Sequence, residues 1–233
     1  SGYWIKRGVG MYDLAAMGAW LEFGVRWLHV ITAIAWLGSS FYFIALDLGL
    51  YRDRKLPSGA DGEEWQVHGG GFYHIQKYLV APENMPDGLI WHKWQSYWTW
   101  ISGFVLLVLV YYLGAKFYLI DPNVVDLAIW QAVGLSLASL AFGWVAYTVL
   151  CNVFVNANQT VLMVALFVVL VAMAWFYTHV FTGRAALLHL GAFTATLMSG
   201  NVFFVIIPNQ KIVVADLMAG RTPDAKYGKI AKQ

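Results

Sequence analysis

Six histidines are the residues in this sequence best able to do chemistry, and three of them fall within long apolar stretches. His29 lies in the first such stretch, and His179 and His189 flank the connection 182–184 between the last two. At a helical rise of ~1.5 Å per residue, His29 would lie about 10 Å inside its span, and the other two roughly 6 and 9 Å below the connection. An ionisable side chain in a membrane span is rare and costly, so three at a similar depth predict a functional site.

Haem ligation is the chemistry that such a cluster favours. Haem b needs axial nitrogens on facing helices and small side chains beside the macrocycle, and we expect His29 to pair with either His179 or His189. Arg26, one turn before His29, could bind a haem propionate, because a guanidinium suits planar carboxylates. It could instead form an i,i+4 ion pair with Glu22. The alternative for each histidine is a neutral side chain hydrogen-bonded to a neighbouring helix.

The other three histidines belong to a more polar segment between two apolar stretches. His68, His74 and His92 could form a metal site, although the six-residue spacing of the first two differs from the i,i+4 pair of many zinc sites. The surrounding residues 67–104 are rich in aromatic side chains, glycine and proline. We expect this stretch to fold back on the membrane as a partly buried reentrant or surface segment. A surface-packed loop that docks a partner is the alternative to the metal site.

The composition dictates the elements that position these histidines. Of 233 residues, 60% are hydrophobic and 12% are charged, against roughly 45–50% and about 25% in a soluble domain. The apolar residues gather into blocks near the ~20 residues needed to cross a ~30 Å hydrocarbon core. The sequence therefore predicts an all-α, polytopic membrane helix bundle of about five transmembrane helices, a single integral membrane domain over 1–233 with a partly ordered cytoplasmic loop. The expected spans are 22–46, 96–114, 127–150, 160–181 and 185–207.

The distribution of Lys and Arg predicts the orientation. Five spans place the termini on opposite sides, and the side with the loop 47–95 and the tail 208–233 carries most of the basic residues. By the positive-inside rule, the loop and the tail are cytoplasmic and the N-terminus lies outside. The net charge of +2 gives no support to a nucleic-acid partner. The basic residues of the loop and tail are Arg52, Arg54, Lys55, Lys77, Lys93, Lys211, Arg221, Lys226, Lys229 and Lys232, and those of the other side are Lys6, Arg7, Lys116 and Arg184.

Aromatic and small side chains mark the predicted spans further. Several tryptophans crowd the start of the second span, and they predict either an interfacial anchor or an aromatic wall around a planar ligand. Small residues recur at helical spacing in the third and fifth spans, where they permit close helix packing. We expect the segment 208–210, which starts with Pro208, to end the last helix. The tryptophans are Trp91, Trp94, Trp98 and Trp100, and the small residues are Ala132, Ser136, Ser139, Gly143, Ala192, Thr196 and Gly200.

Six stretches of the sequence carry a family resemblance. They are RWLHVITAIAWLGSSFYF at 26–43, VHGGGFYHIQKYLVAPENMPDGLIWHKW at 67–94, YLIDP at 118–122, WQAVG at 130–134, FTGRAALLHLGA at 181–192 and NVFFVIIPNQ at 201–210. Together they resemble the N-terminal membrane domain of the bacterial membrane-bound, cytochrome-c-fused urate oxidase (urate hydroxylase) family. The stretch 67–94 is the most specific. The first stretch is also distantly similar to the first helix of bacterial haem-binding protoporphyrinogen oxidases, which puts His29 in the position of a haem ligand.

The resemblance implies oxidation of urate toward 5-hydroxyisourate, with electrons passing through haem b to a cytochrome c outside the bacterial inner (cytoplasmic) membrane. In the family, the chain continues past the position that matches Gln233 with more helices and a cytochrome c domain. This sequence has one cysteine, Cys151, and therefore no Cys-x-x-Cys-His motif for a c-type haem.

Two functions follow from these observations. For urate oxidation, the site of a planar monoanion should combine a cation, aromatic walls and amide partners, and no general base is recognisable. The alternative is a non-catalytic transmembrane subunit of a larger respiratory or photosynthetic electron-transfer complex. The urate-binding candidates, in and beside the loop, are Tyr73, Gln76, Lys77, Trp91 and Gln95.

Overall fold

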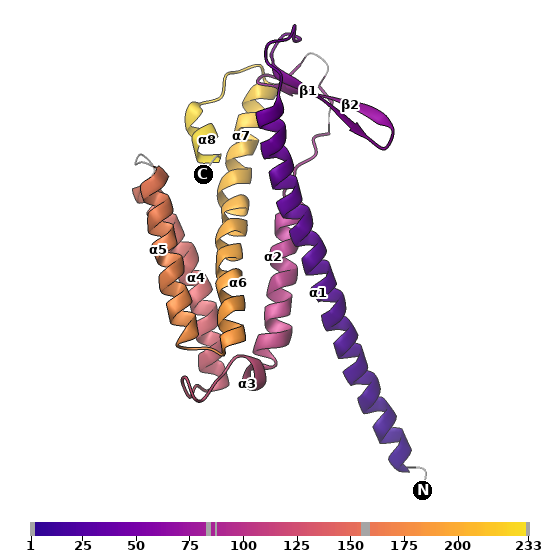
Figure 1. Cartoon of the computed structure of the whole chain (residues 1–233), viewed down its shortest axis with the longest axis vertical. Helices are drawn as coiled ribbons and strands as arrows, with labels where there is room; N and C mark the ends of the chain where they lie inside the picture. Colours follow the sequence, from indigo (N-terminus) through magenta and orange to yellow (C-terminus); the bar gives the residue numbers. More distant parts are fainter. Residues whose placement is uncertain (1–2, 83–84, 87, 155–158, 232–233) are drawn as a thin grey trace. The chain divides into compact units, whose positions relative to one another are not determined.

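The chain is mostly helical, as a computed structural model of residues 3–82, 85–86, 88–154 and 159–231 shows (Figure 1). Lys232 and the side chains of Lys6, Arg7 and Lys229 lie outside the described residues. The elements are α1 (Tyr3–Gly49), β1 (Ala60–His68), β2 (Gly71–Tyr78), α2 (Trp94–Leu106), the π-helix η1 (Leu107–Tyr112), α3 (Ala115–Tyr118), α4 (Ile129–Val153), α5 (Gln159–Thr178), α6 (Gly183–Asn201), the π-helix η2 (Val202–Ile206), α7 (Ile207–Met218) and α8 (Ala225–Ala231).

The predicted fold class, a helical membrane protein, is confirmed. Among the described residues, four helices are long and apolar enough to cross a membrane, and they overlap four of the five expected spans. The expected span 96–114 is also helical as far as Tyr112, through α2 (Trp94–Leu106) and η1 (Leu107–Tyr112). Its first half is rich in tryptophan and polar side chains, which lowers its mean hydropathy. The four candidate spans are Asp13–Gly49, Ile129–Val153, Thr160–Thr178 and Gly183–Met218.

The segment between α1 and α2 differs from the sequence-based expectation. Residues expected to form a loop contain an antiparallel hairpin, in which β1 pairs with β2 from Ala60↔Tyr78 to His68↔Gly71. Its two-residue turn is Gly69-Gly70, and both have positive φ (60° and 78°), the conformation that a tight hairpin requires.

Pro208 does not end the last helix, so that prediction was wrong. The helix continues from α6 through η2 into α7, and Pro208 occupies the first turn of α7, where its missing N–H costs little. The Asn209 amide donates a 2.7 Å hydrogen bond to the carbonyl of Val205, which satisfies a backbone group near the proline. The helix ends instead at Ala219, followed by Gly220 with φ 68°.

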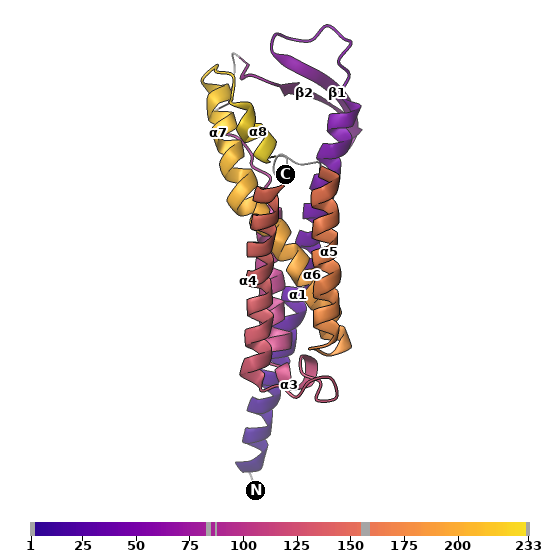
Figure 2. The same ribbon diagram turned by 90° about the vertical axis from the view of Figure 1, so that its left-hand side faces the viewer.

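The chain forms two compact units, and the first contains Ser1–Thr32 and Tyr97–Gly200. Its helices α4, α5 and α6 run with roughly aligned axes (Figure 1, Figure 2). The predicted small-residue seams are confirmed, because an added Cβ would strike the ring of Phe193 at Gly143 and the ring of Trp144 at Gly200. Fully buried side chains of this unit include Leu119, Tyr177, Phe181, His189 and Phe193.

The second unit contains Ala33–Ser96 and Asn201–Gln233. It holds the end of α1, the β1–β2 hairpin, α7 and α8. The segment after β2 meets α7 through a hydrogen bond from Ala81 N to Leu217 O at 3.3 Å. The isolated bridge Tyr51↔Glu63 joins the residues after α1 to β1. These contacts position the hairpin at the end of α1.

Candidate functional site

The first unit contains a cavity of about 380 Å³, which is within the usual size of small-molecule sites. It is lined by residues of α1, α2, η1, α4 and α6. Aliphatic and small residues make up most of its wall. Its polar lining consists of Arg26, His29, Thr99, Tyr111, Arg184 and Thr196.

His29 is held in the cavity wall by its Nδ1 atom. Nδ1 lies 3.0 Å from the carbonyl oxygen of Thr99 and 3.2 Å from Oγ of Ser102. A carbonyl can only accept a hydrogen bond, so this contact favours the tautomer with the proton on Nδ1 and a lone pair on Nε2. Nε2 has no hydrogen-bond partner among the described residues. A carbonyl on one ring nitrogen is the arrangement that commonly orients a metal-ligating histidine.

Gly103 makes room for this imidazole. A Cβ at Gly103 would lie 2.8 Å from Cε1 of His29. A larger residue at this position would therefore displace the ring from its contact with Thr99. Gly191, Ala192 and Ala195 also line the cavity, and they leave space for a flat ligand.

Two arginines supply positive charge to the cavity. Arg26 forms the predicted i,i+4 ion pair with Glu22. Arg184, at the start of α6, has no ion pair with any acidic side chain in the described part of the chain. Arg184 is thus the cavity cation whose charge is available to an anionic ligand.

Tyr111 is a site residue that the sequence analysis missed. It lies in η1, its side chain is 4% exposed, and its hydroxyl lies near Arg184 but has no partner with hydrogen-bond geometry among the described residues. A buried unpaired hydroxyl costs free energy, so such a group commonly meets a ligand or water. The available signal was the Tyr111-Tyr112 pair at the end of an apolar run, and a π-helix is often found at functional sites.

Trp100 and Phe104 form an aromatic part of the cavity wall. Their rings stack at 5.3 Å with an interplanar angle of 12°. The indole N–H of Trp100 donates to Oγ1 of Thr196 at 3.1 Å, which fixes the ring. Of the four clustered tryptophans, Trp100 is the one that lines the cavity. The position of Trp100 therefore agrees with the interpretation of the tryptophans as an aromatic wall around a planar ligand.

His189 lies outside the cavity lining, and both of its nitrogens are engaged. Nε2 lies 2.8 Å from Oγ of Ser136, and Nδ1 lies 2.8 Å from the carbonyl oxygen of Ala185. Ser136 also bonds the Tyr112 hydroxyl at 2.8 Å. The side chain is fully buried and its ring contacts that of Phe181 at 4.7 Å. His189 is therefore a satisfied core histidine in this structure.

His179 is also apart from the cavity. It is exposed, its Nδ1 lies 2.7 Å from the carbonyl oxygen of Trp175, and its ring lies 4.4 Å from the indole of that residue. The structure thus brings neither His179 nor His189 beside His29. The three rings have different neighbours, since His29 contacts Thr99, His189 contacts Ser136 and His179 contacts Trp175.

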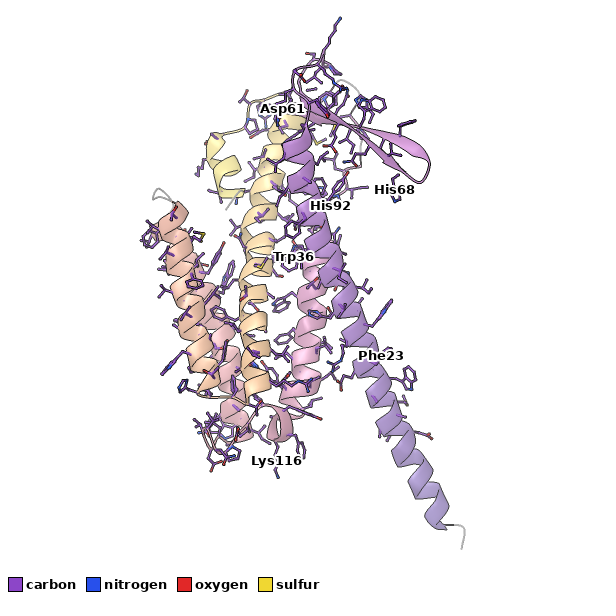
Figure 3. All side chains as sticks on the ribbon, viewed as in Figure 1. Phe23, Trp36, Asp61, His68, His92 and Lys116 are labelled. Atoms are coloured by element: carbon purple, nitrogen blue, oxygen red, sulfur yellow. The ribbon has the colours of Figure 1, made fainter. Side chains whose placement is uncertain are left out.

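The second group of histidines does not converge either. His68 ends β1 at the hairpin turn, and Figure 3 shows it apart from His92. His92 lies against Phe43, with ring centroids 4.8 Å apart. Within the described residues, no three or more His, Cys, Asp or Glu side chains are placed to hold a metal ion.

His74 forms a pair with Glu63 instead. Its Nε2 lies 2.7 Å from a Glu63 carboxylate oxygen, and its ring stacks on Trp65 at 4.2 Å. The hydrogen bond from His74 lowers the pKa of the Glu63 carboxyl below its usual range. This pair links the two strands of the hairpin.

The urate-binding candidates of the loop do not form one cluster. Tyr73 and Lys77 lie on one face of β2, and Gln76 lies on the other because side chains alternate along a strand. Lys77 pairs with Asp47 at 2.7 Å, and Gln76 accepts a hydrogen bond from Tyr78. The remaining two, Trp91 and Gln95, are outside the hairpin, and the Gln95 side chain contacts His92.

Comparison with known families gives one result that bears on function. A family model described as urate oxidase N-terminal matches residues 15–233. Neither a curated protein nor a solved structure matched the chain.

Proposed function

Because the chain belongs to the urate oxidase N-terminal family, we propose that it is the membrane domain of a urate-oxidising protein that passes electrons through haem b to an external cytochrome c. The family match over nearly the whole chain supports the reaction. The cavity around His29 supports the electron carrier, and it is the observation on which this proposal chiefly rests.

The cavity residues fit haem b with a single histidine ligand. Nε2 of His29 would bind the iron, while the Thr99 carbonyl holds the ring in the required tautomer. The guanidinium of Arg184 would neutralise one propionate, and Arg26 would bind the other only by exchanging its ion pair with Glu22. The small residues Gly191, Ala192 and Ala195 leave space for a flat ring. Bound there, haem b would supply a one-electron carrier.

The proposed orientation puts this cavity near the external acceptor. If the N-terminus faces outward, as the Lys and Arg distribution predicts, the connection 182–184 lies on the outer side of a bacterial inner membrane. Arg184 in this connection lines the cavity. Electrons therefore need to travel only a short distance from the cavity to a cytochrome c outside.

A second candidate is that the same cavity binds urate itself. The observation in its favour is the pairing of an arginine that lacks a carboxylate, Arg184, with the buried unpartnered hydroxyl of Tyr111. Urate is a planar monoanion that can accept hydrogen bonds from both groups, and Trp100 and Phe104 would provide its apolar wall. Lys77 is a weaker candidate cation because Asp47 already pairs with it.

Both candidates predict that Arg184→Gln lowers urate oxidation. Loss of a charged partner costs roughly 1.5–3 kcal/mol, which corresponds to a decrease of about ten- to a hundredfold in kcat/KM. The assay is urate consumption by the full-length protein in membranes with added cytochrome c.

Lys116→Gln is the matched control, because Lys116 is an exposed cation of α3 outside the cavity lining. We expect it to oxidise urate at the wild-type rate. Equal rates for the Arg184 variant and the wild type would contradict the role of the cavity. Absence of urate consumption with any acceptor would exclude the enzyme and favour a non-catalytic subunit of an electron-transfer complex.

A further inference from the structure

The β1–β2 hairpin folds back along the end of α1. The Glu64 carboxylate lies against Gly49, where a Cβ would be 2.6 Å from its Oε2. Two residues further along β1, Gln66 accepts a 2.8 Å hydrogen bond from the Tyr42 hydroxyl. Gly49 and Tyr42 are about 10 Å apart along a helix, so β1 runs from the end of α1 toward its middle. Figure 3 shows this slant, with Asp61 near the end of α1 and His68 at about the level of His92.

The tip of this hairpin exposes apolar side chains. Val67 pairs with Phe72 one residue pair away from the turn, and their exposed fractions are 70% and 79%. Trp65 lies on the same face and is 54% exposed. A polar turn would be expected at the tip of a hairpin that extends into water. This tip therefore has a surface suited to an apolar environment.

The uncharged part of α1 indicates that the apolar environment of the tip is the lipid bilayer. Between Arg26 and Asp47 lie twenty residues, 27 to 46, without a charged side chain, the length that crosses a ~30 Å hydrocarbon core. The Cα atom of Tyr42 is then about 7 Å inside the core boundary at Asp47. Since Gln66 bonds the Tyr42 hydroxyl, the tip that follows Gln66 lies near the boundary between the lipid headgroups and the hydrocarbon core.

The charges around the hairpin agree with this position. Arg52, Arg54 and Lys55 follow α1 directly, and all three are exposed. Arg52 pairs with Asp61 and Arg54 with Glu63, so Lys55 is the cation of this group without an ion pair among the described residues. Basic residues beside a span attract anionic headgroups. Tryptophan is the residue that favours the headgroup level, which suits Trp65. Within the uncharged part of α1, Phe41 and Ile44 are 69% and 56% exposed, so this part of the helix also has an apolar surface.

We infer that the tip of the hairpin, formed by Val67 and Phe72, inserts into the headgroup region of the bilayer beside α1. The occupant of this apolar surface is thus lipid. The hairpin is a second membrane attachment, which holds the segment after α1 flat against the membrane. The inference does not depend on haem or urate binding.

Fluorescent labelling of single cysteines tests this inference. In a Cys151→Ser background, Val67→Cys and, separately, Phe72→Cys would carry an environment-sensitive fluorophore in nanodiscs of phosphatidylcholine and phosphatidylglycerol. We expect blue-shifted emission and strong quenching by lipids with a nitroxide near the headgroup. Ser58→Cys, an exposed position before β1, is the matched control and should show water-like emission without quenching.

Two results would overturn the inference. Water-like emission at both tip positions would mean that the tip is solvated. Blue-shifted emission without quenching by nitroxide lipids would mean that protein, from a partner or a second copy, covers the tip. Two tip positions are used so that a perturbation by either substitution is recognised by disagreement with the other.

Discussion

Replacing His29 with alanine is expected to remove the b-type haem absorption of the protein, whereas His179→Ala should leave it unchanged. His29 is the histidine that lines the cavity, with Nδ1 bound to Thr99 and Nε2 available. His179 is exposed beside Trp175 and away from the cavity lining. The measurement is the reduced-minus-oxidised spectrum of each purified variant, normalised to protein.

His179→Ala is a matched control because it removes the same side chain from another helix of the same unit. Far-UV circular dichroism should show equal helix content in both variants. Retention of the full b-type spectrum by the His29 variant would contradict the proposed ligand. Loss of the spectrum in the His179 variant would restore the histidine pair predicted from the sequence.

His189→Ala is expected to destabilise the protein by about 2–5 kcal/mol, the range for a large buried side chain that leaves a cavity. The substitution also leaves Oγ of Ser136 without its contact to the ring. Ser136→Ala removes less volume and should cost less, about 1–3 kcal/mol from the unpaired group. Thermal unfolding in detergent should give Tm values in the order wild type, Ser136→Ala, His189→Ala.

This prediction separates a core histidine from a ligand. A His189 variant with a wild-type Tm and no haem spectrum would make His189 a haem ligand. A lowered Tm with the haem spectrum retained at low temperature is the result that the structure predicts. Together, the predictions for His29 and His189 therefore determine which of the two binds haem and which is a core residue.

Much of the fold could be predicted because it depends on composition and on residue spacing along single helices. The apolar blocks predicted the membrane helices. The helical spacing of small residues within each of two spans, which end at Gly143 and Gly200, predicted close packing against other helices. The ion pair of Glu22 with Arg26 followed from the i,i+4 spacing alone. Each of these properties is local to one helix.

The composition of the site could be predicted only in part, because it depends on helix rotation. Depth along a helix follows from the rise per residue, and it placed His29 and His189 at similar levels. The direction of each side chain depends on the packing of neighbouring helices, which turns His189 toward Ser136 and away from the cavity. The position of Tyr111 in the cavity wall depends on the π-helix η1, which the Tyr111-Tyr112 pair alone does not predict.

The hairpin and the continuous last helix depended on contacts that residue pattern does not reveal. The hairpin has one face against α1, where Gln66 bonds Tyr42, and this tertiary contact supports strands in a segment that resembled a loop. At Pro208, the expected helix end was replaced by a π-helical turn and a side-chain hydrogen bond from Asn209. In both cases, contacts with neighbouring residues outweigh the conformation that the local sequence favours.

Anaerobic addition of urate to the purified full-length protein tests the central claim most directly. If the chain is the membrane domain of a urate oxidase with haem b at His29, urate should convert the oxidised b-type spectrum to the reduced one. The Arg184→Gln variant should need a higher urate concentration or react more slowly. A haem that dithionite reduces but urate leaves oxidised would contradict the account.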